Sequence, residues 1–256
     1  TVVVPIVHGA MRVCLVGDHR QLPPTIVSRE AEMHGLGTSL FDRLQRGGVQ
    51  RHLLRTQFRM NPGLCVYPSA AFYNSEVGSG VMGSVRTPPL GVEWPIPGVG
   101  LLFLNCSAGL EDAEGQSQLN RAEAQVVAQV IQQLLLAGEV HPGQVGVITP
   151  YAAQVRLLRQ LLRGTLAESD VNSVDGFQGR EKDVIVVSTV RSSAGGGVGF
   201  LSDQRRLNVT LTRGKRALII VGNANTLLRD AQCWGPWLQW AQGVGAVQGE
   251  EAGDES

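Results

Sequence analysis

The 256-residue chain carries no net charge, is poor in lysine and has few cysteines. Its 22 basic and 22 acidic residues cancel, so whole-molecule charge predicts neither a nucleic-acid nor a membrane partner. Any site for a polyanion must therefore be local. Only Lys182 and Lys215 are lysines, and the remaining basic residues are arginines. Codon bias is the simpler explanation of this skew, although the planar guanidinium also suits bidentate contacts with phosphate.

The four cysteines form no CxxC pair and no cluster with metal-ligand spacing. This pattern favours reduced thiols in a cytoplasmic or nuclear protein and predicts no metal site. No apolar run approaches the roughly 20 residues needed to span a membrane, so no membrane partner is expected. The start, TVVVPIVHGA, lacks a basic segment, a signal-type apolar core and a Met, and we expect a chain cut from something longer.

Short apolar runs rich in β-branched residues recur along the chain, as in parallel strands covered on both faces. We predict strands over residues 13–17, 101–105, 145–149, 171–174, 183–190 and 217–222. The clearest helix lies between them at 121–137, with Asn120 as its cap and Glu123 at the capping-box position. A second helix follows TPY (149–151) and runs through Val155, Leu158 and Leu162 to Gly164. This alternation predicts an α/β fold with a doubly wound parallel sheet and helices on both faces.

Three segments break the alternation. Residues 78–100 are rich in Gly and Pro and are expected to form a surface connection. Residues 192–199, SSAGGGVG, are predicted to be a flexible loop beside the sheet. The acidic end, GEEAGDES, is predicted to be disordered.

Four polar clusters adjoin the predicted strands. GDHRQLPP and QFRMNP each follow a short apolar run, DGFQGREKD follows the run at 171–174, and RRLNVTLTRGK precedes the last strand. Ligands of doubly wound sheets bind beyond the carboxyl ends of the strands, so polar residues placed there are candidates for function. Taken singly, each cluster has an ordinary explanation as a turn, an ion pair or a solvated helix face. Their joint order along the chain carries more information than any one of them.

In that order, the clusters resemble the C-terminal part of the superfamily 1 helicases of the Upf1-like (DNA2/NAM7-type) group, over residues 13–223. Within the group, the chain is similar to the large zinc-finger helicases that also act as nuclear-receptor coactivators. The resemblance implies a RecA-like sheet of the P-loop NTPase type. It also implies that ATP binds between two RecA-like domains, which move along single-stranded nucleic acid as the cleft opens and closes.

The resemblance assigns three residues to catalysis. Gln21 matches the sensor of the γ-phosphate, and Arg59 and Arg213 match arginine fingers. A guanidinium stays protonated at any working pH and stabilises the charge that builds on a departing phosphoryl group. Two fingers on a mobile domain would make hydrolysis depend on closure of the cleft.

The resemblance also assigns three residues to nucleotide binding. Asp18 belongs to the turn that couples the γ-phosphate to the nucleic-acid path, and its prolines stiffen the exit from the strand. Phe58 matches the aromatic residue that stacks on adenine, and Glu181 fits the acidic residue near the ribose hydroxyls. The implied cofactors are ATP and Mg²⁺, with the metal ligands supplied by a domain upstream.

The single-strand channel of the family corresponds to residues that follow two predicted strands. Thr149 and Tyr151 follow one strand, and Ser173 and Asp175 follow another. Hydroxyls and backbone amides there hold phosphates without reading sequence. For Tyr151 the alternative is a packing residue at the start of a helix, and the sequence does not separate the two.

Two motifs of the family's ATP site are missing. The sequence holds no GxxxxGK[ST] phosphate loop, and no DExx box precedes residue 13. We therefore expect residues 1–50 to end a first RecA-like domain, residues 51–230 to form the second with motifs IV to VI, and residues 231–256 to form a tail. The chain alone is then half of an ATPase and is expected to be inactive.

Two functions follow from the sequence. The first is the C-terminal motor half of an ATP-dependent helicase, with RNA favoured over DNA and an upstream RecA-like domain as partner. The alternative is a non-catalytic module for RNA or protein interaction that kept the fold. The presence of Gln21, Arg59, Glu181 and Arg213 favours the motor, because a protein without turnover has no chemical reason to keep both fingers.

Overall fold

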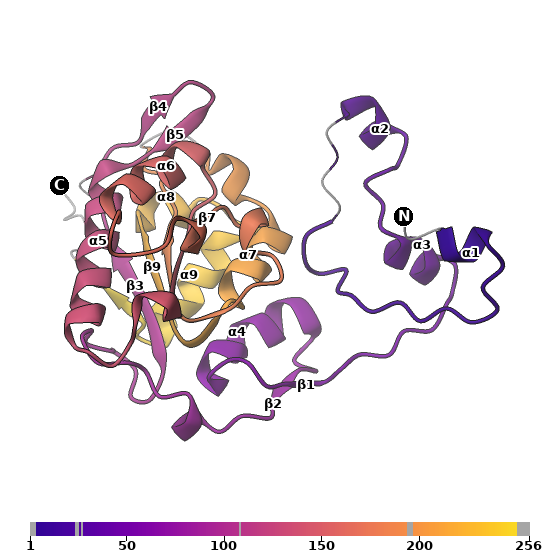
Figure 1. The fold of residues 1–256 in the computed structure, drawn as a ribbon, viewed down its shortest axis with the longest axis horizontal. Coiled ribbons are helices and arrows are strands. Elements are labelled where there is room, and N and C mark those ends of the chain that lie inside the picture. The colour runs from indigo at the N-terminus through magenta and orange to yellow at the C-terminus, as the bar shows by residue number, and fades with distance from the viewer. Residues whose placement is uncertain (1–3, 24–25, 27, 108, 194–196, 250–256) are drawn as a thin grey trace. The chain divides into compact units, whose positions relative to one another are not determined.

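The chain is represented by a computed structural model that describes residues 4–23, 26, 28–107, 109–193 and 197–249. It divides into two compact units, Thr1–Leu54 and Arg55–Ser256 (Figure 1). None of the helices in the described residues is long and apolar enough to cross a membrane.

The first unit contains short helices, α1 (Val4–Val7), α2 (Arg29–Met33) and α3 (Leu40–Arg46). The predicted strand at 13–17 is wrong, because these residues have no strand partner and the side chains of Val13 and Val16 are 48% and 87% exposed. A strand needs neighbours for its backbone N–H and C=O groups, and the described residues of this unit form no other strand. An apolar run alone therefore does not produce a strand here.

The second unit is built on a six-stranded sheet in the order β10-β3-β9-β8-β6-β7. Every neighbouring pair in it is parallel. The strands are β3 (Gly100–Asn105), β6 (Val145–Ile148), β7 (Val171–Asn172), β8 (Lys182–Ser188), β9 (Gly214–Gly222) and β10 (Val247–Gln248). The predicted parallel sheet is confirmed. β10 was not predicted, because a strand of two residues has no recognisable sequence pattern.

Helices cover both faces of the sheet. They are α4 (Pro62–Tyr73), α5 (Arg121–Leu136), α6 (Ala152–Leu161), α7 (Gln204–Leu211), α8 (Ala224–Leu228) and α9 (Trp234–Gly243). Leu102 and alternate residues of the central strands pack with α5 and α6 in one buried cluster. Phe103 points to the opposite face, where its ring lies 6.0 Å from that of Trp237 in α9. Successive side chains of β3 thus pack into two hydrophobic cores, one on each face of the sheet.

Smaller elements surround this sheet. β1 (Thr56–Gln57) pairs with β2 (Gly78–Ser79), and β4 (Asp112–Glu114) forms a hairpin with β5 (Ser117–Leu119). Single 3₁₀ turns are η1 (Gly83–Val85), η2 (Pro142–Gln144), η3 (Glu168–Asp170), η4 (Asp175–Phe177) and η5 (Gly199–Leu201). The segment 78–100 is otherwise irregular apart from a bridge between Ile96 and Val99, as its Gly and Pro content predicted.

The start of α5 confirms one predicted cap and corrects another. The Asn120 side chain accepts a hydrogen bond from the Glu123 amide, as expected of a cap. The capping box is wrong, because the Asn120 amide donates to Oε1 of Gln154 at 2.9 Å. The Glu123 side chain instead turns into the core. Gln154 comes from α6, so only the packing of the two helices decides this contact.

Residues 231–248, predicted as a tail, continue the fold. They form α9 and β10, and Val247 of β10 pairs with Phe103 of β3. The acidic end at 250–256 and residues 194–196 of the predicted loop lie outside the described residues.

Candidate functional site

The candidate site residues of the second unit lie at opposite ends of its parallel strands. Glu181 and Arg213 directly precede β8 and β9, so they share the amino edge of the sheet. Thr149 and Ser173 directly follow β6 and β7, so they share the carboxyl edge. Not all of the polar clusters therefore lie beyond the carboxyl ends. The segment 173–181 crosses from one edge to the other.

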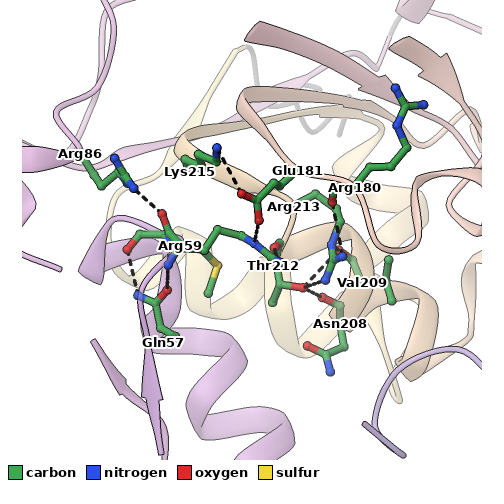
Figure 2. Close-up of polar contacts among 11 residues, drawn as sticks. Gln57, Arg59, Arg86, Arg180, Glu181, Asn208, Val209, Thr212, Arg213 and Lys215 are labelled. Carbon is green, nitrogen blue, oxygen red and sulfur yellow. Dashed lines mark hydrogen bonds and ion pairs between the residues drawn. The ribbon is translucent and has the colours of Figure 1, made fainter. Parts of the chain in front are cut away.

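At the amino edge, Glu181 joins two cations (Figure 2). Its Oε2 lies 2.5 Å from Nε of Arg59, and its Oε1 lies 3.1 Å from Nζ of Lys215. Partial burial acts to raise the pKa of Glu181, but hydrogen bonds and charges from Arg59 and Lys215 lower it below its ordinary value. Arg59 also donates from Nη1 to the carbonyl of Thr212 at 2.8 Å. The fold thus brings together Arg59 and Glu181, which are 122 positions apart in the chain.

Gln57 shapes the turn that carries Phe58 and Arg59. Its Oε1 accepts from the amides of Arg59 and Met60 at 2.8 and 2.7 Å. Its Nε2 donates to the Met60 carbonyl, and Arg86 donates from Nε to the Arg59 carbonyl (Figure 2). The sequence analysis assigned no role to Gln57 or Arg86. The position of Gln57 within QFRM was the one available signal.

Phe58 presents an open aromatic ring. Its side chain is 66% exposed, and a Cβ added at Gly80 would come within 2.3 Å of the ring. The ring therefore lies directly over the glycine, and any side chain at position 80 would displace it. A supported but solvent-facing ring, carried by the residue next to Arg59, suits stacking of a planar group.

Arg213 is placed differently from Arg59. It is only 2% exposed, and its guanidinium donates to the Val209 carbonyl, Oγ1 of Thr212 and the Arg180 carbonyl at 3.0, 3.0 and 3.4 Å. Figure 2 shows it directed toward the end of α7. In this structure Arg213 therefore ties the end of α7 to the loop before β8.

The residues predicted for the single-strand channel differ in exposure. Thr149 is fully buried, and its Oγ1 has no hydrogen-bond partner in the described structure. Tyr151 is 5% exposed, and its hydroxyl lies 3.4 Å from the Val198 carbonyl. This placement favours packing for Tyr151. Ser173 is half-buried and accepts from the Gly176 amide, whereas Asp175 is exposed.

The turn of the first unit that holds Gln21 is internally bonded. Nε2 of Gln21 donates to Oδ2 of Asp18 at 2.9 Å, and the Arg20 amide donates to Oδ1 of the same carboxylate. The Gln21 amide donates to the Asp18 carbonyl. The two residues that sequence reasoning paired are thus held side by side by an Asp-centred turn.

The described residues offer no group of three His, Cys, Asp or Glu side chains arranged to hold a metal ion. The cysteines are all free thiols. Cys65 and Cys233 are buried, and burial raises the pKa of Cys233 to about 12. These thiols therefore belong to the core and not to a reactive centre.

Glu123 is a functional candidate that sequence reasoning missed. It is fully buried, and its Oε2 accepts from the Ser188 hydroxyl at 2.7 Å and the Val190 amide at 2.8 Å. Its Oε1 has no hydrogen-bond partner within the described part of the chain. Burial raises the pKa of Glu123 to about 7, although these two hydrogen bonds favour the charged form. No signal in the sequence separates it from an ordinary first-turn glutamate.

Comparison with known proteins adds to this geometry. Two family models, each described as an AAA domain, match residues 36–225 and 1–29. The Regulator of nonsense transcripts 1 homolog of Drosophila melanogaster is 43% identical over 245 residues, which are 93% of this chain and 21% of that protein. The ATP-dependent helicase NAM7 of Saccharomyces cerevisiae is 45% identical over 237 residues, 89% of this chain and 24% of that protein.

A third relative is the ATP-dependent helicase upf1 of Schizosaccharomyces pombe. It is 40% identical over 238 residues, 89% of this chain and 26% of that protein. The chain therefore spans only 21% to 26% of the length of these relatives.

Proposed function

Because the chain belongs to the Upf1-like group of superfamily 1 helicases, we propose that it is the C-terminal motor half of an ATP-dependent helicase that acts on RNA. In this proposal residues 1–50 end the first RecA-like domain and residues 51–230 carry motifs IV to VI of the second. RNA is favoured over DNA because the names of several relatives refer to transcripts. The expected partners are single-stranded nucleic acid and the upstream domain.

The observation that carries this proposal is the cluster at the amino edge. Arg59 and Glu181 are 122 positions apart in the chain and pair just before β8. The exposed ring of Phe58 belongs to the residue next to Arg59. A structural ion pair does not require an exposed aromatic residue next to it in the chain. A nucleotide requires both an apolar face for its base and cations for its phosphates.

Each residue of the cluster has a chemical task toward ATP. Phe58 supplies the face on which the adenine stacks, and Glu181 accepts hydrogen bonds from the ribose hydroxyls. Arg59 uses Nε and Nη1 within the protein, and the remaining N–H donors of its guanidinium are available for phosphate. When bound, ATP with Mg²⁺ supplies the phosphoanhydride whose cleavage drives movement.

No residue of this chain is assigned to Mg²⁺. The described residues hold no group of carboxylates arranged for a cation, and the sequence contains no phosphate loop. The contribution of the chain lies instead in charge stabilisation by Arg59 and Arg213, with Gln21 as the sensor in the turn at Asp18. A fixed guanidinium acts without gaining or losing a proton.

Contacts with the strand are proposed at the carboxyl edge. Thr149, Ser173 and Asp175 follow strands there. The hydroxyls of Thr149 and Ser173 and the neighbouring backbone amides suit phosphates more than bases. Tyr151 is buried and is assigned to packing. A zinc-finger parent and a cytoplasmic or nuclear location stay predictions.

The purified chain is expected to hydrolyse ATP at no more than background. The lysine and metal ligands that hold the phosphates in this family belong to motifs that the sequence does not contain. Phosphate release with and without RNA measures this directly. Robust RNA-stimulated turnover by the purified chain would contradict the division of the ATP site between two halves.

In the complete protein, Phe58→Ala is expected to weaken ATP binding by about tenfold, a loss typical of base–aromatic stacking. The melting temperature should change little because the ring is 66% exposed. Fluorescent-nucleotide titration and thermal unfolding measure the two effects. Leu90→Ala, at an equally exposed position, is the matched control and should leave affinity unchanged. Wild-type affinity in Phe58→Ala would assign the ring to packing.

The alternative of a non-catalytic interaction module makes a different prediction. A module should bind RNA or protein whether or not ATP is present, and the complete protein should show no RNA-stimulated turnover. A helicase should show stimulated turnover and strand separation. Assays of both activities on the complete protein therefore separate the two functions.

A further inference from the structure

A strained residue follows the end of β8. Val190 has φ +71°, and it is the one β-branched residue with positive φ among the described non-glycine residues. Both backbone groups of Val190 are held by the start of α5. Its amide donates to Oε2 of Glu123 at 2.8 Å, and its carbonyl accepts from Nδ2 of Asn120 at 3.2 Å.

This arrangement is built into the core. Glu123, Asn120 and Val190 are all fully buried, and Gln154 of α6 completes the network by binding the backbone of Asn120. A bulky residue keeps a left-handed conformation only when its surroundings impose it, and such strain concentrates at functional sites.

The turn at Val190 directs two N–H donors to one carboxylate oxygen. Nε of Arg191 and the amide of Ser192 both bind Oε2 of Glu111, at 2.7 and 2.9 Å. The side chains of Arg191 and Glu111 are only 14% and 16% exposed. A side chain at Gly199 would come within 2.6 Å of Nη1 of Arg191, so Gly199 lies close to the guanidinium. The result is a preformed, sheltered anion site.

The occupant of this site comes from an irregular segment. Glu111 lies between β3 and β4, and its neighbour Leu110 is 78% exposed. The site lies at the carboxyl edge, because Arg191 follows β8 as Thr149 follows β6, and the two strands are neighbours. A phosphodiester oxygen accepts the same two N–H donors as a carboxylate and carries the same charge.

We propose that Arg191 and the Ser192 amide bind a phosphate of the single strand, and that Glu111 occupies their site until the strand displaces it. The proposal rests on the proposed function, since it names a contact of the same strand. Glu111 then competes with the strand for these two donors, so the strand binds only when it displaces this carboxylate. The hydrogen bonds that join Val190 to Glu123 and Asn120 keep both donors in position.

The test uses the complete protein, a labelled twelve-nucleotide oligouridine without nucleotide, and binding measured over a series of salt concentrations. Glu111→Gln should tighten binding by about three- to tenfold, because the neutral amide competes less well. Arg191→Gln should weaken binding by a similar factor and reduce the slope of log K against log salt by about one. The double variant should behave like Arg191→Gln.

Glu114→Gln is the matched control, because Glu114 pairs with Arg156 on the exposed hairpin. It should bind like wild type. Unchanged or weaker binding in Glu111→Gln overturns the proposal, as does an unchanged salt slope in Arg191→Gln. A purely structural ion pair would move the melting temperature of both variants but not the slope.

If Arg191→Gln fails to fold, Arg191→Lys replaces it, since lysine keeps the charge and loses the planar fork. Its binding should still be weaker than wild type, and wild-type binding overturns the site. A wild-type protein that does not bind the oligouridine overturns the proposed function together with this site. A wild type that binds, with variants that do not differ from it, overturns this site alone.

Discussion

Replacing Arg59 with alanine in the complete protein is expected to lower RNA-stimulated ATP turnover by about 10³-fold or more, as removal of an arginine finger does in phosphoryl transfer. The charge is needed mainly in the transition state, so nucleotide binding should suffer less. RNA affinity without nucleotide should stay at the wild-type level, because the proposed strand contacts lie at the opposite edge of the sheet. Steady-state ATPase and RNA titrations at fixed salt measure these effects.

Two further variants sharpen this experiment. Arg59→Lys should rescue turnover poorly, because an ammonium does not reproduce the bonds from Nε to Glu181 and from Nη1 to Thr212. Arg55→Ala removes a nearby exposed arginine that pairs with Glu76, and it should behave like wild type. Normal unwinding by Arg59→Ala would show that Arg59 is not a finger.

Arg213→Ala should differ from Arg59→Ala in one respect. Turnover should also fall, but the variant leaves buried carbonyl and hydroxyl acceptors without their donor. We expect a loss of about 2 to 4 kcal/mol in the free energy of unfolding. Urea unfolding of both variants separates the roles, and an unchanged unfolding free energy in Arg213→Ala would exclude the structural one.

The second large effect is a pH-dependent stability change at Glu123. Its pKa is raised from 4.5 to about 7 in the folded state. The unfolded chain therefore releases this proton at a lower pH than the folded protein does, and wild-type stability falls as pH rises from about 4.5 to about 7. Each pKa unit corresponds to about 1.4 kcal/mol.

Glu123→Gln removes this dependence, because an amide keeps the hydrogen-bonding shape without a charge. The variant's free energy of unfolding minus that of wild type should be higher at pH 8 than at pH 5 by about 2 kcal/mol, because only wild type loses this stability as the pH rises. Urea denaturation at the two pH values measures the difference. Glu114→Gln on the exposed hairpin should show no such change. The same relative stability at both pH values in Glu123→Gln would show that the folded-state pKa is not raised.

The sequence by itself determined the sheet and the long helices. The apolar runs at 101–105, 145–149, 183–190 and 217–222 become β3, β6, β8 and β9. A strand that is apolar on both faces is stable only in the middle of a sheet covered on both sides. The cap at Asn120 is equally local, since it joins residues three positions apart. The family resemblance carried by QFRMNP and GREKD predicts a nucleotide site, and this stays a prediction.

Tertiary structure decided the rest. A run such as 13–17 becomes a strand only beside another strand, and a pair such as Val247 and Gln248 becomes one only because β3 lies next to it. Which edge a cluster occupies depends on where the chain crosses the sheet. The burial of Arg213, the raised pKa of Glu123 and the strain at Val190 arise from contacts between segments far apart in the chain. Periodicity reports which face of an element is buried, whereas desolvation and hydrogen-bond partners depend on what packs against that face.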